Sequence, residues 1–192
     1  MKRFFLNSAL LANLLMTPFM LPLHAETKSD LKPRTFTVNQ KTARFKGLVP
    51  EGWEALVDVY NTPLTLVSKK GSQDSRSVIQ IIPYGVKDHD DSLVKFKKDP
   101  EEFYSQKESW LEMMDGESIS YEPFEESLAD GIAILSIGIK YKNDLGHFLD
   151  KSFYLSSKTK EIFFVKAIIP LDLEKEHSGE LDRVVRSLAT LN

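Results

Sequence analysis

The segment that most restricts the fold lies near the end of the chain, at residues 162–169, with the sequence IFFVKAII. Apolar residues occupy both alternating sets of positions, so both faces of an extended strand here would be largely apolar. Such a strand is stable only where other elements cover it. The segment therefore predicts a central, covered strand of a β-sheet.

The neighbouring segments predict the rest of an antiparallel meander. Residues 131–142 and 147–157 place apolar side chains at alternate positions, and short turns join them to each other and to 162–169. Short connections allow only antiparallel pairing. Further strands are predicted at residues 36–38, 43–45, 53–60, 64–68, 78–82 and 117–124.

Two helices are predicted beside these strands. Asp99 can accept from the free N–H groups of a first helical turn, and Pro100 needs no donor there. One face of this helix then carries Phe103, Lys107, Trp110, Leu111 and Met114, and Gly116 closes it. A second helix is predicted from a cap at Asp172, with a stripe formed by Leu173, His177, Leu181, Val184 and Leu188. One helix on each face of the sheet, or both on one face, would cover the central strand, which predicts an α+β fold.

The first 25 residues have the pattern of a cleaved signal peptide. Lys2 and Arg3 precede an apolar run, which ends before Ala25. Prolines and polar residues interrupt the run, which favours a signal over the alternative of an uncleaved membrane anchor. We expect a flexible lead-in at residues 26–34, a single domain at 35–192, and a periplasmic or secreted protein with no stable membrane anchor after cleavage.

The composition excludes several kinds of function. The full chain has a net charge of −3, and the signal removes two cations and no acid, so the mature chain is more acidic still. An acidic chain without a basic cluster is a poor binder of nucleic acid or of an anionic membrane surface. The absence of cysteine excludes disulfides, thiol catalysis and zinc sites built from cysteine.

No catalytic or cofactor-binding motif is evident, and no cofactor is expected. A phosphate-binding glycine loop, a dinucleotide fingerprint and the common hydrolase and metalloprotease motifs are missing. The best candidate for a metal site is the polar segment KDHDD, in which His89, Asp90 and Asp91 are the predicted ligands. Adjacent residues cannot all converge on one ion without a special loop, so a solvated loop explains the same residues.

Other residues with possible chemical roles have structural explanations. Trp53 begins an alternating apolar face with Ala55, Val57 and Val59, which predicts a core residue that anchors its strand. His147 and Asp150 are three positions apart on a strand and therefore lie on opposite faces. His177 is on the apolar stripe of the second helix, where a packed histidine is the usual explanation.

The predicted partner-binding residues are Tyr121, Glu122, Phe124 and Glu125. They belong to the segment YEPFEES, in which carboxylates surround two aromatic side chains. Protein interfaces are enriched in aromatic residues and have polar rims. A solvated turn is the alternative interpretation of this segment.

Three segments resemble PsbP-like domains, which include the lumenal extrinsic proteins of photosystem II, a Ran-binding nuclear import factor and bacterial envelope proteins of the DcrB type. They are FKGLVPEGWEALVDVYNTPLTLVSKK at residues 45–70, KSFYLSSKTKEIFFVKAIIP at 151–170, and LDRVVRSLATL at 181–191. The resemblance implies an α/β/α sandwich around an antiparallel sheet, and binding or assembly roles without a shared catalytic centre. The DcrB type carries a lipid-bearing cysteine, which this chain lacks.

These observations favour an exported, non-catalytic binding or accessory protein that acts on a protein partner in the cell envelope. Two alternatives remain. The chain could be an immunity-type inhibitor of an envelope toxin or hydrolase, or an unrecognised metal-binding protein or hydrolase built around His89 or His147.

Overall fold

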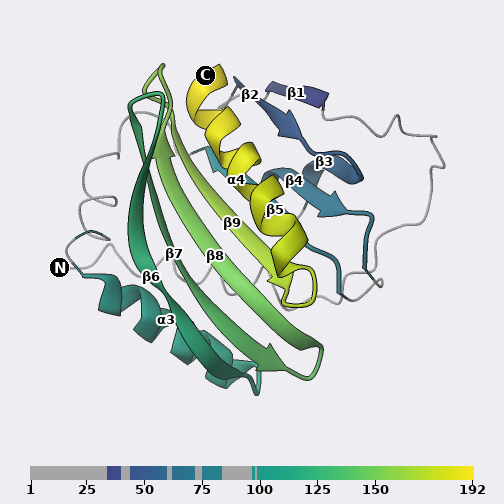
Figure 1. Ribbon diagram of the computed structural model, residues 1–192, viewed down its shortest axis with the longest axis vertical. Coiled ribbons are helices and arrows are strands. Elements are labelled where there is room, and N and C mark those ends of the chain that lie inside the picture. Colours follow the sequence, from purple (N-terminus) through teal and green to yellow (C-terminus); the bar gives the residue numbers. More distant parts are fainter. Residues whose placement is uncertain (1–33, 40–43, 60–61, 72–74, 84–96, 98) are drawn as a thin grey trace. The chain divides into compact units, whose positions relative to one another are not determined.

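The computed structural model of the chain describes residues 34–39, 44–59, 62–71, 75–83, 97 and 99–192 (Figure 1). All of them belong to one compact unit, Leu31–Asn192. The predicted signal peptide and nearly all of the predicted lead-in lie outside the described residues.

A seven-stranded antiparallel sheet is the centre of the unit, with the strand order β3-β4-β5-β9-β8-β7-β6. Its strands are β3 (Trp53–Val59), β4 (Thr62–Ser68), β5 (Val78–Pro83), β6 (Glu117–Ala129), β7 (Ile132–Asn143), β8 (Gly146–Ser156) and β9 (Ile162–Pro170). A separate two-stranded antiparallel sheet is formed by β1 (Arg34–Asn39) and β2 (Arg44–Val49). The predicted strands and the antiparallel meander are confirmed.

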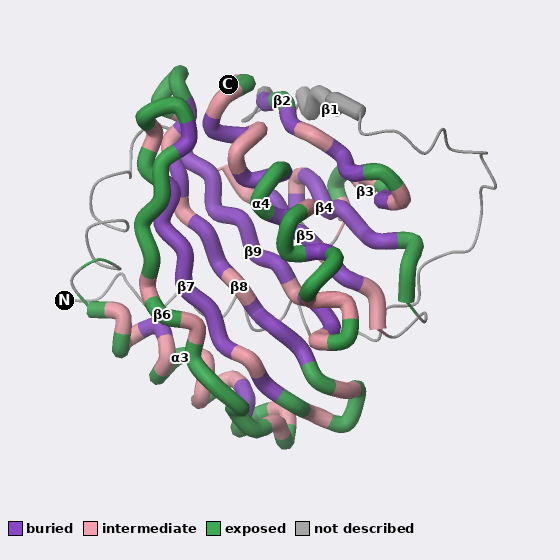
Figure 2. The backbone as a smooth tube through the Cα atoms, in the orientation of Figure 1, coloured by how far each residue is buried: buried purple, intermediate pink, exposed green. Residues whose placement is uncertain are grey.

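Strand β9 occupies the middle of the sheet and is buried on both faces, as its sequence predicts. Phe163, Val165, Ala167 and Ile169 belong to the larger of two core clusters. Phe164 and Lys166 are buried on the opposite face. Figure 2 shows β7, β8 and β9 buried along most of their length, whereas β6 is mainly exposed.

Helix α4 (Glu174–Leu191) covers the face of β9 that carries Val165. Its buried residues are His177, Leu181, Val184, Val185, Leu188 and Ala189, which include most of the predicted stripe. The predicted cap at Asp172 is wrong. Leu173 is the N-cap residue and makes no side-chain cap bond, because the chain leaves β9 through a turn in which Leu173 N donates to Pro170 O at 2.9 Å.

Helix α3 (Pro100–Met113) covers the other face of the sheet, beside β6, β7 and β8. Its predicted cap is confirmed, since Glu102 N donates to Asp99 Oδ1 at 3.3 Å. Leu111 packs with Ile139, Tyr141 and Phe148 in the second core cluster. Of the helices in the described residues, one therefore lies on each face, which gives an α/β/α sandwich.

Two details of the strands differ from the prediction, and both occur at sheet edges. Strand β6 continues to Ala129, because bulges between Ser118 and Ser120 and between Glu122 and Glu125 absorb the irregular segment that contains Pro123. In β3, Trp53 is buried, but the predicted apolar face fails at Val57, which is 53% exposed. Asp58 has a φ of 56° and interrupts the alternation there.

The end of α4 also holds strand β2 in place. Lys46 N donates to Asn192 Oδ1 at 2.7 Å, and Asn192 Nδ2 donates to Lys46 O at 2.8 Å. Leu48 N donates to Ser187 Oγ at 2.9 Å. Side chains of the last helix thus satisfy main-chain groups of β2 that a neighbouring strand would otherwise satisfy.

Close packing of strands at Gly138 gives a test of the fold. A Cβ atom at this position would lie 2.8 Å from Asp150 O, a backbone atom that cannot move without displacing β8. We expect Gly138→Ala to lower the free energy of unfolding by about 1–3 kcal/mol through overpacking. Urea unfolding monitored by circular dichroism measures this change.

The matched control is Gly179→Ala in α4, where an added Cβ would meet no atom within 4 Å. Alanine has a higher helix propensity than glycine, so this variant should gain about 0.5–1 kcal/mol. Equal effects of the two substitutions would contradict the packing described around Gly138.

Candidate functional site

The four predicted partner-binding residues lie on β6, but they do not share one face. Tyr121 pairs with Ile139 and projects toward α3, whereas Glu122 and Glu125 pair with Gly138 and Ser136 and project to the α4 face. Phe124 lies within the second bulge. Residues adjacent in sequence are therefore separated by the thickness of the sheet.

Tyr121 is half exposed and is held against α3. Its ring lies 4.6 Å from that of Tyr104, and its hydroxyl donates to a carboxylate oxygen of Glu108. This hydrogen bond raises the pKa of Tyr121 above its ordinary value. The tyrosine pair thus gives the α3 side of β6 a rigid aromatic surface.

Glu122 connects β6 to its neighbours on the other side. Its carboxylate lies 3.4 Å from Lys140 Nζ, and its main-chain oxygen accepts from the Tyr104 hydroxyl at 2.7 Å. Lys140 also donates to Glu174 at 2.8 Å, and that hydrogen bond raises the pKa of Lys140. Glu122 is therefore part of an ion-pair network that fixes the edge strand.

Exposed apolar side chains gather on β6 and the end of α3. Among the described residues, seven large apolar side chains are exposed; three of these are on β6, and Met113 ends α3 beside it. Strand β6 carries four glutamates and no basic residue. We call this region the α3–β6 surface; it comprises Met113, Ile119, Tyr121 and Leu128 with the exposed carboxylates of Glu101, Glu112 and Glu126.

The main-chain edge of β6 is protected against pairing with a further strand. Pro123 has no N–H to donate, and the two bulges break the regular register. Arg186 Nη1 also donates to Leu128 O at 2.9 Å. A partner on the α3–β6 surface would therefore contact side chains rather than extend the sheet.

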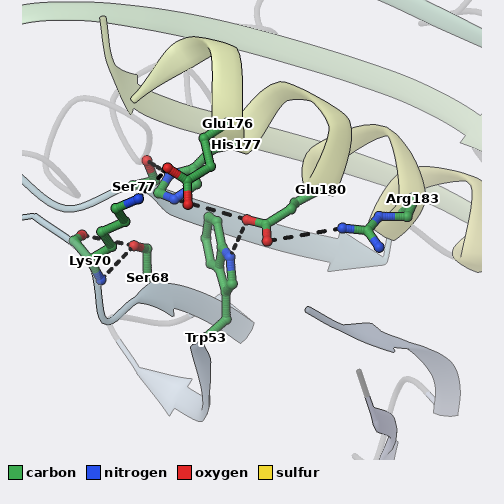
Figure 3. Close-up of polar contacts among 8 residues, drawn as sticks. All are labelled: Trp53, Ser68, Lys70, Ser77, Glu176, His177, Glu180 and Arg183. Atoms are coloured by element: carbon green, nitrogen blue, oxygen red, sulfur yellow. Dashed lines mark hydrogen bonds and ion pairs between the residues drawn. The ribbon is translucent and has the colours of Figure 1, made fainter. Parts of the chain in front are cut away.

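A chain of polar contacts fastens the first half of α4 to β3 and to Ser77, beside the start of β5 (Figure 3). Trp53 Nε1 donates to Glu180 Oε2 at 2.6 Å, and the same oxygen lies 3.9 Å from His177 Nε2. His177 Nδ1 and Ser77 Oγ are 2.6 Å apart. The structure confirms both predictions for these side chains, since Trp53 and His177 are buried in the core.

This serine, histidine and glutamate have the composition of a hydrolytic triad, but their arrangement favours a structural role. Ser77 is completely buried, and a catalytic serine must reach a substrate. The Trp53 and His177 rings pack edge to face at 5.1 Å and close the space around the imidazole. Burial lowers the pKa of His177, against the opposing effect of nearby Glu180 and Glu176.

A second polar cluster lies under α3 on the opposite face. Lys107 Nζ donates to Asp150 Oδ2 at 2.6 Å, and Lys166 Nζ lies 3.5 Å from the same oxygen. The Trp110 ring is 5.7 Å from Lys107 Nζ and 5.5 Å from Lys166 Nζ, within the range of cation–π attraction. Asp150 is fully buried, and its Oδ1 has no partner among the described residues.

Burial and charge compete at these groups. Burial alone would raise the pKa of Asp150, but the ammonium groups of Lys107 and Lys166 outweigh it and keep the pKa below its ordinary value. Burial lowers the pKa of Lys166 to about 8, although Asp150 opposes this change. The cluster is thus a buried, ionised group in which two ammoniums share one carboxylate.

Sequence reasoning placed Lys107 on the buried stripe of α3 and separated Asp150 from His147, which is exposed. It did not find the cluster, because Asp150 lies 43 positions from Lys107 and the sheet register joins them. One sequence feature could have indicated it: Lys166 is a charged residue in the otherwise apolar segment 162–169, so it needs an opposing charge nearby.

The predicted metal ligands His89, Asp90 and Asp91 lie outside the described residues. Within the described ranges, no three or more His, Asp or Glu side chains are grouped so that they could hold a metal ion. Neither α3 nor α4, the two helices of those ranges, combines the length and apolarity needed to cross a bilayer.

This chain is similar to solved structures of other proteins, although its sequence alone gives no match. No family model and no curated protein matches the sequence. The PsbP protein CyanoP of Synechocystis sp. PCC 6803 matches with a TM-score of 0.58 and 11% identity, over 86% of this chain and 97% of that one. LpqN of Mycobacterium tuberculosis matches with a TM-score of 0.52 and 12% identity, over 79% and 87%.

The chain has the PsbP-like fold. The Ran-binding protein Mog1p of Saccharomyces cerevisiae also matches, with a TM-score of 0.46 and 11% identity over 82% of this chain and 95% of that one. The PsbP-like fold confirms the resemblance read from the sequence and the α+β class. At these identities the likeness extends to the fold alone.

The buried cluster of the PsbP-like sheet leads to a stability prediction. Asp150→Asn keeps the shape of the side chain but leaves the buried ammonium of Lys166 and the partly buried one of Lys107 without a carboxylate. We expect a loss of about 3–5 kcal/mol in the free energy of unfolding, measured by urea titration at pH 7. Asp144→Asn, in the exposed turn between β7 and β8, is the control and should change little. Similar losses in both variants would contradict a special role for Asp150.

His177 leads to a prediction about pH. The pKa of His177 in the folded chain is below its ordinary value of 6.5, which the unfolded chain retains. At a pH between the folded and the unfolded pKa, the unfolded chain therefore binds a proton that the folded chain does not. Stability should therefore fall as the pH drops below about 6.5. Urea unfolding at pH 7.5 and 5.5 should show a smaller difference for His177→Gln than for the natural chain. An unchanged difference would contradict this assignment.

Proposed function

We propose that the chain is an exported, non-catalytic accessory protein that binds a protein partner in the cell envelope through the α3–β6 surface. The observation that carries the proposal is the concentration of exposed apolar side chains on this one surface. Tyr121 and Leu128 are 50% and 63% exposed, and the same surface carries exposed carboxylates. Apolar centres with polar rims are typical of protein interfaces.

Three further points support the proposal. The N-terminal sequence has the pattern of an export signal. LpqN, which has the same fold, is involved in cell envelope biogenesis. The serine, histidine and glutamate with the composition of a hydrolytic triad are closed to substrates, since Ser77 is completely buried.

Charge indicates the nature of the partner surface. Strand β6 carries four glutamates, and α3 adds four more against a single lysine, which is already paired with Asp150. Lys97, Lys140 and Lys142 balance only some of these carboxylates. We therefore infer that the partner presents lysine or arginine side chains around an apolar centre.

Site-specific photo-crosslinking in cells that naturally produce the chain tests this proposal. A photoreactive phenylalanine analogue at Ser118 or Glu126, both exposed on β6 and on its α3 side, should give one discrete protein adduct. The same analogue at Lys175 or Ser178, both exposed on α4, is the control and should give none. Adding Tyr121→Ala should reduce the adduct severalfold, because it removes the aromatic centre.

The outcomes separate the candidate functions. An adduct with an envelope assembly protein supports an accessory role, whereas one with a toxin or hydrolase supports the immunity-type alternative. No adduct from either β6 position, or equal adducts from α4, would overturn the proposed surface.

A further inference from the structure

A row of polar side chains crosses the α3 face of the sheet at the level of Lys166. Thr65 pairs with Gln80, Gln80 with Lys166, and Lys166 with Ser152. Directly opposed residues of antiparallel strands project to the same face, with Cβ atoms about 4.5–5.5 Å apart. The four side chains therefore follow one another across β4, β5, β9 and β8, in the middle of the sheet.

These side chains are polar in a place where the sheet is otherwise apolar. Thr65, Ser152 and Lys166 are each at most 5% exposed, and Gln80 is partly buried. The hydroxyls of Thr65 and Ser152 and the amide of Gln80 make no hydrogen bond to another described residue. Buried polar groups normally have a hydrogen-bond partner, so the row has unused capacity to bind.

The charges beside the row are also unbalanced. Lys107 and Lys166 together carry two positive charges, and Asp150 is the one carboxylate in contact with them among the described residues. Lys107 makes the shorter contact, at 2.6 Å, whereas Lys166 is 3.5 Å from the same oxygen. Buried charges require compensation, and Lys166 is the less compensated of the two.

We propose that Thr65, Gln80, Lys166 and Ser152 form a binding site for a small oxyanion, the carboxylate or phosphate group of a small molecule. The ammonium group supplies the charge, and the hydroxyl and amide groups supply hydrogen-bond donors. Asp150 Oδ1, which has no partner among the described residues, marks a second unmet hydrogen bond at the same place. An oxyanion that also carries a hydroxyl group, such as a hydroxy acid or singly ionised phosphate, would accept from the Lys166 ammonium and donate to Asp150 Oδ1.

The protonation of Lys166 links this site to pH. Burial lowers the pKa of Lys166 to about 8, so the group is mostly protonated at pH 7. A bound anion stabilises the ammonium form and should raise that pKa. Affinity should therefore decrease as the pH rises from 7 to 9. Phosphate itself changes its ionisation near neutral pH, whereas acetate stays ionised over this range. A decrease in acetate affinity with rising pH can therefore be assigned to the titration of Lys166.

The test is titration of the purified chain with inorganic phosphate or sodium acetate, against sodium chloride at equal ionic strength. Calorimetry measures the dissociation constant, and the unfolding temperature provides a second readout. We expect saturable binding of phosphate, acetate or both, which distinguishes a phosphate ligand from a carboxylate ligand. Lys166→Met should weaken binding by at least about tenfold, because a charge-assisted hydrogen bond is lost.

Two further variants keep the test decisive. Thr65→Val has the same shape as the natural residue and should weaken binding about fivefold without loss of the fold. Lys158→Met removes a lysine from an exposed turn and should leave binding unchanged. No saturable binding beyond the chloride control, or full binding by Lys166→Met, would overturn the site. The α3–β6 surface is separate, so failure of one proposal leaves the other standing.

Discussion

Burial of β9 on both faces is the constraint on which the rest of the structure depends. A strand of this kind needs a layer on each side, and α4 and α3 supply the two layers. The single charged residue of the strand, Lys166, then imposes a second requirement. An isolated buried ammonium costs several kcal/mol, and Asp150 of the adjacent strand β8 supplies the opposing charge. Lys107 connects this pair to α3, so the chemistry of one position in β9 extends to the helix that covers it.

The same architecture buries one set of polar groups, on the α4 side of the sheet, and leaves another set exposed, at the β6 edge. On the α4 side, Trp53, Glu180, His177 and Ser77 form a continuous set of contacts that fastens the helix across β3 to the start of β5. Their burial makes them a means of holding the sandwich together in a chain that has no cysteine for disulfides. At the β6 edge, by contrast, side chains are accessible to solvent, because α3 covers only one side of the strand and Tyr121 remains half exposed. At that edge side chains are exposed, whereas Pro123 and the Arg186 hydrogen bond to Leu128 O limit pairing of the main chain with a further strand.

Local patterns were enough to predict most of the elements. Asp99 followed by Pro100 gave the start of α3, and the apolar segment 162–169 gave the central strand. Predictions failed where the chain departs from regular geometry, as at the bulges of β6 and the turn that places Leu173 rather than Asp172 at the helix cap. The clusters could not be predicted, because Trp53 and Glu180 are 127 positions apart and only tertiary packing joins them. Within the predicted partner-binding segment, the register shows what the sequence does not, namely that the adjacent residues Tyr121 and Glu122 lie on opposite faces of their strand.

The fold itself does not explain the polar row beside Lys166. Replacing a buried ion pair with well-packed apolar residues is often neutral or stabilising, so a sandwich of this type needs no lysine at this position. The sheet would be covered equally well with valine or isoleucine at Thr65, Gln80 and Ser152, as at Val67, Val78 and Ile168, the next positions on the same face. The chain instead places four polar side chains in adjacent strands at one level of the sheet, next to an unpaired carboxylate oxygen. Stability alone would favour apolar residues there, and the proposed oxyanion site would account for all four polar residues together.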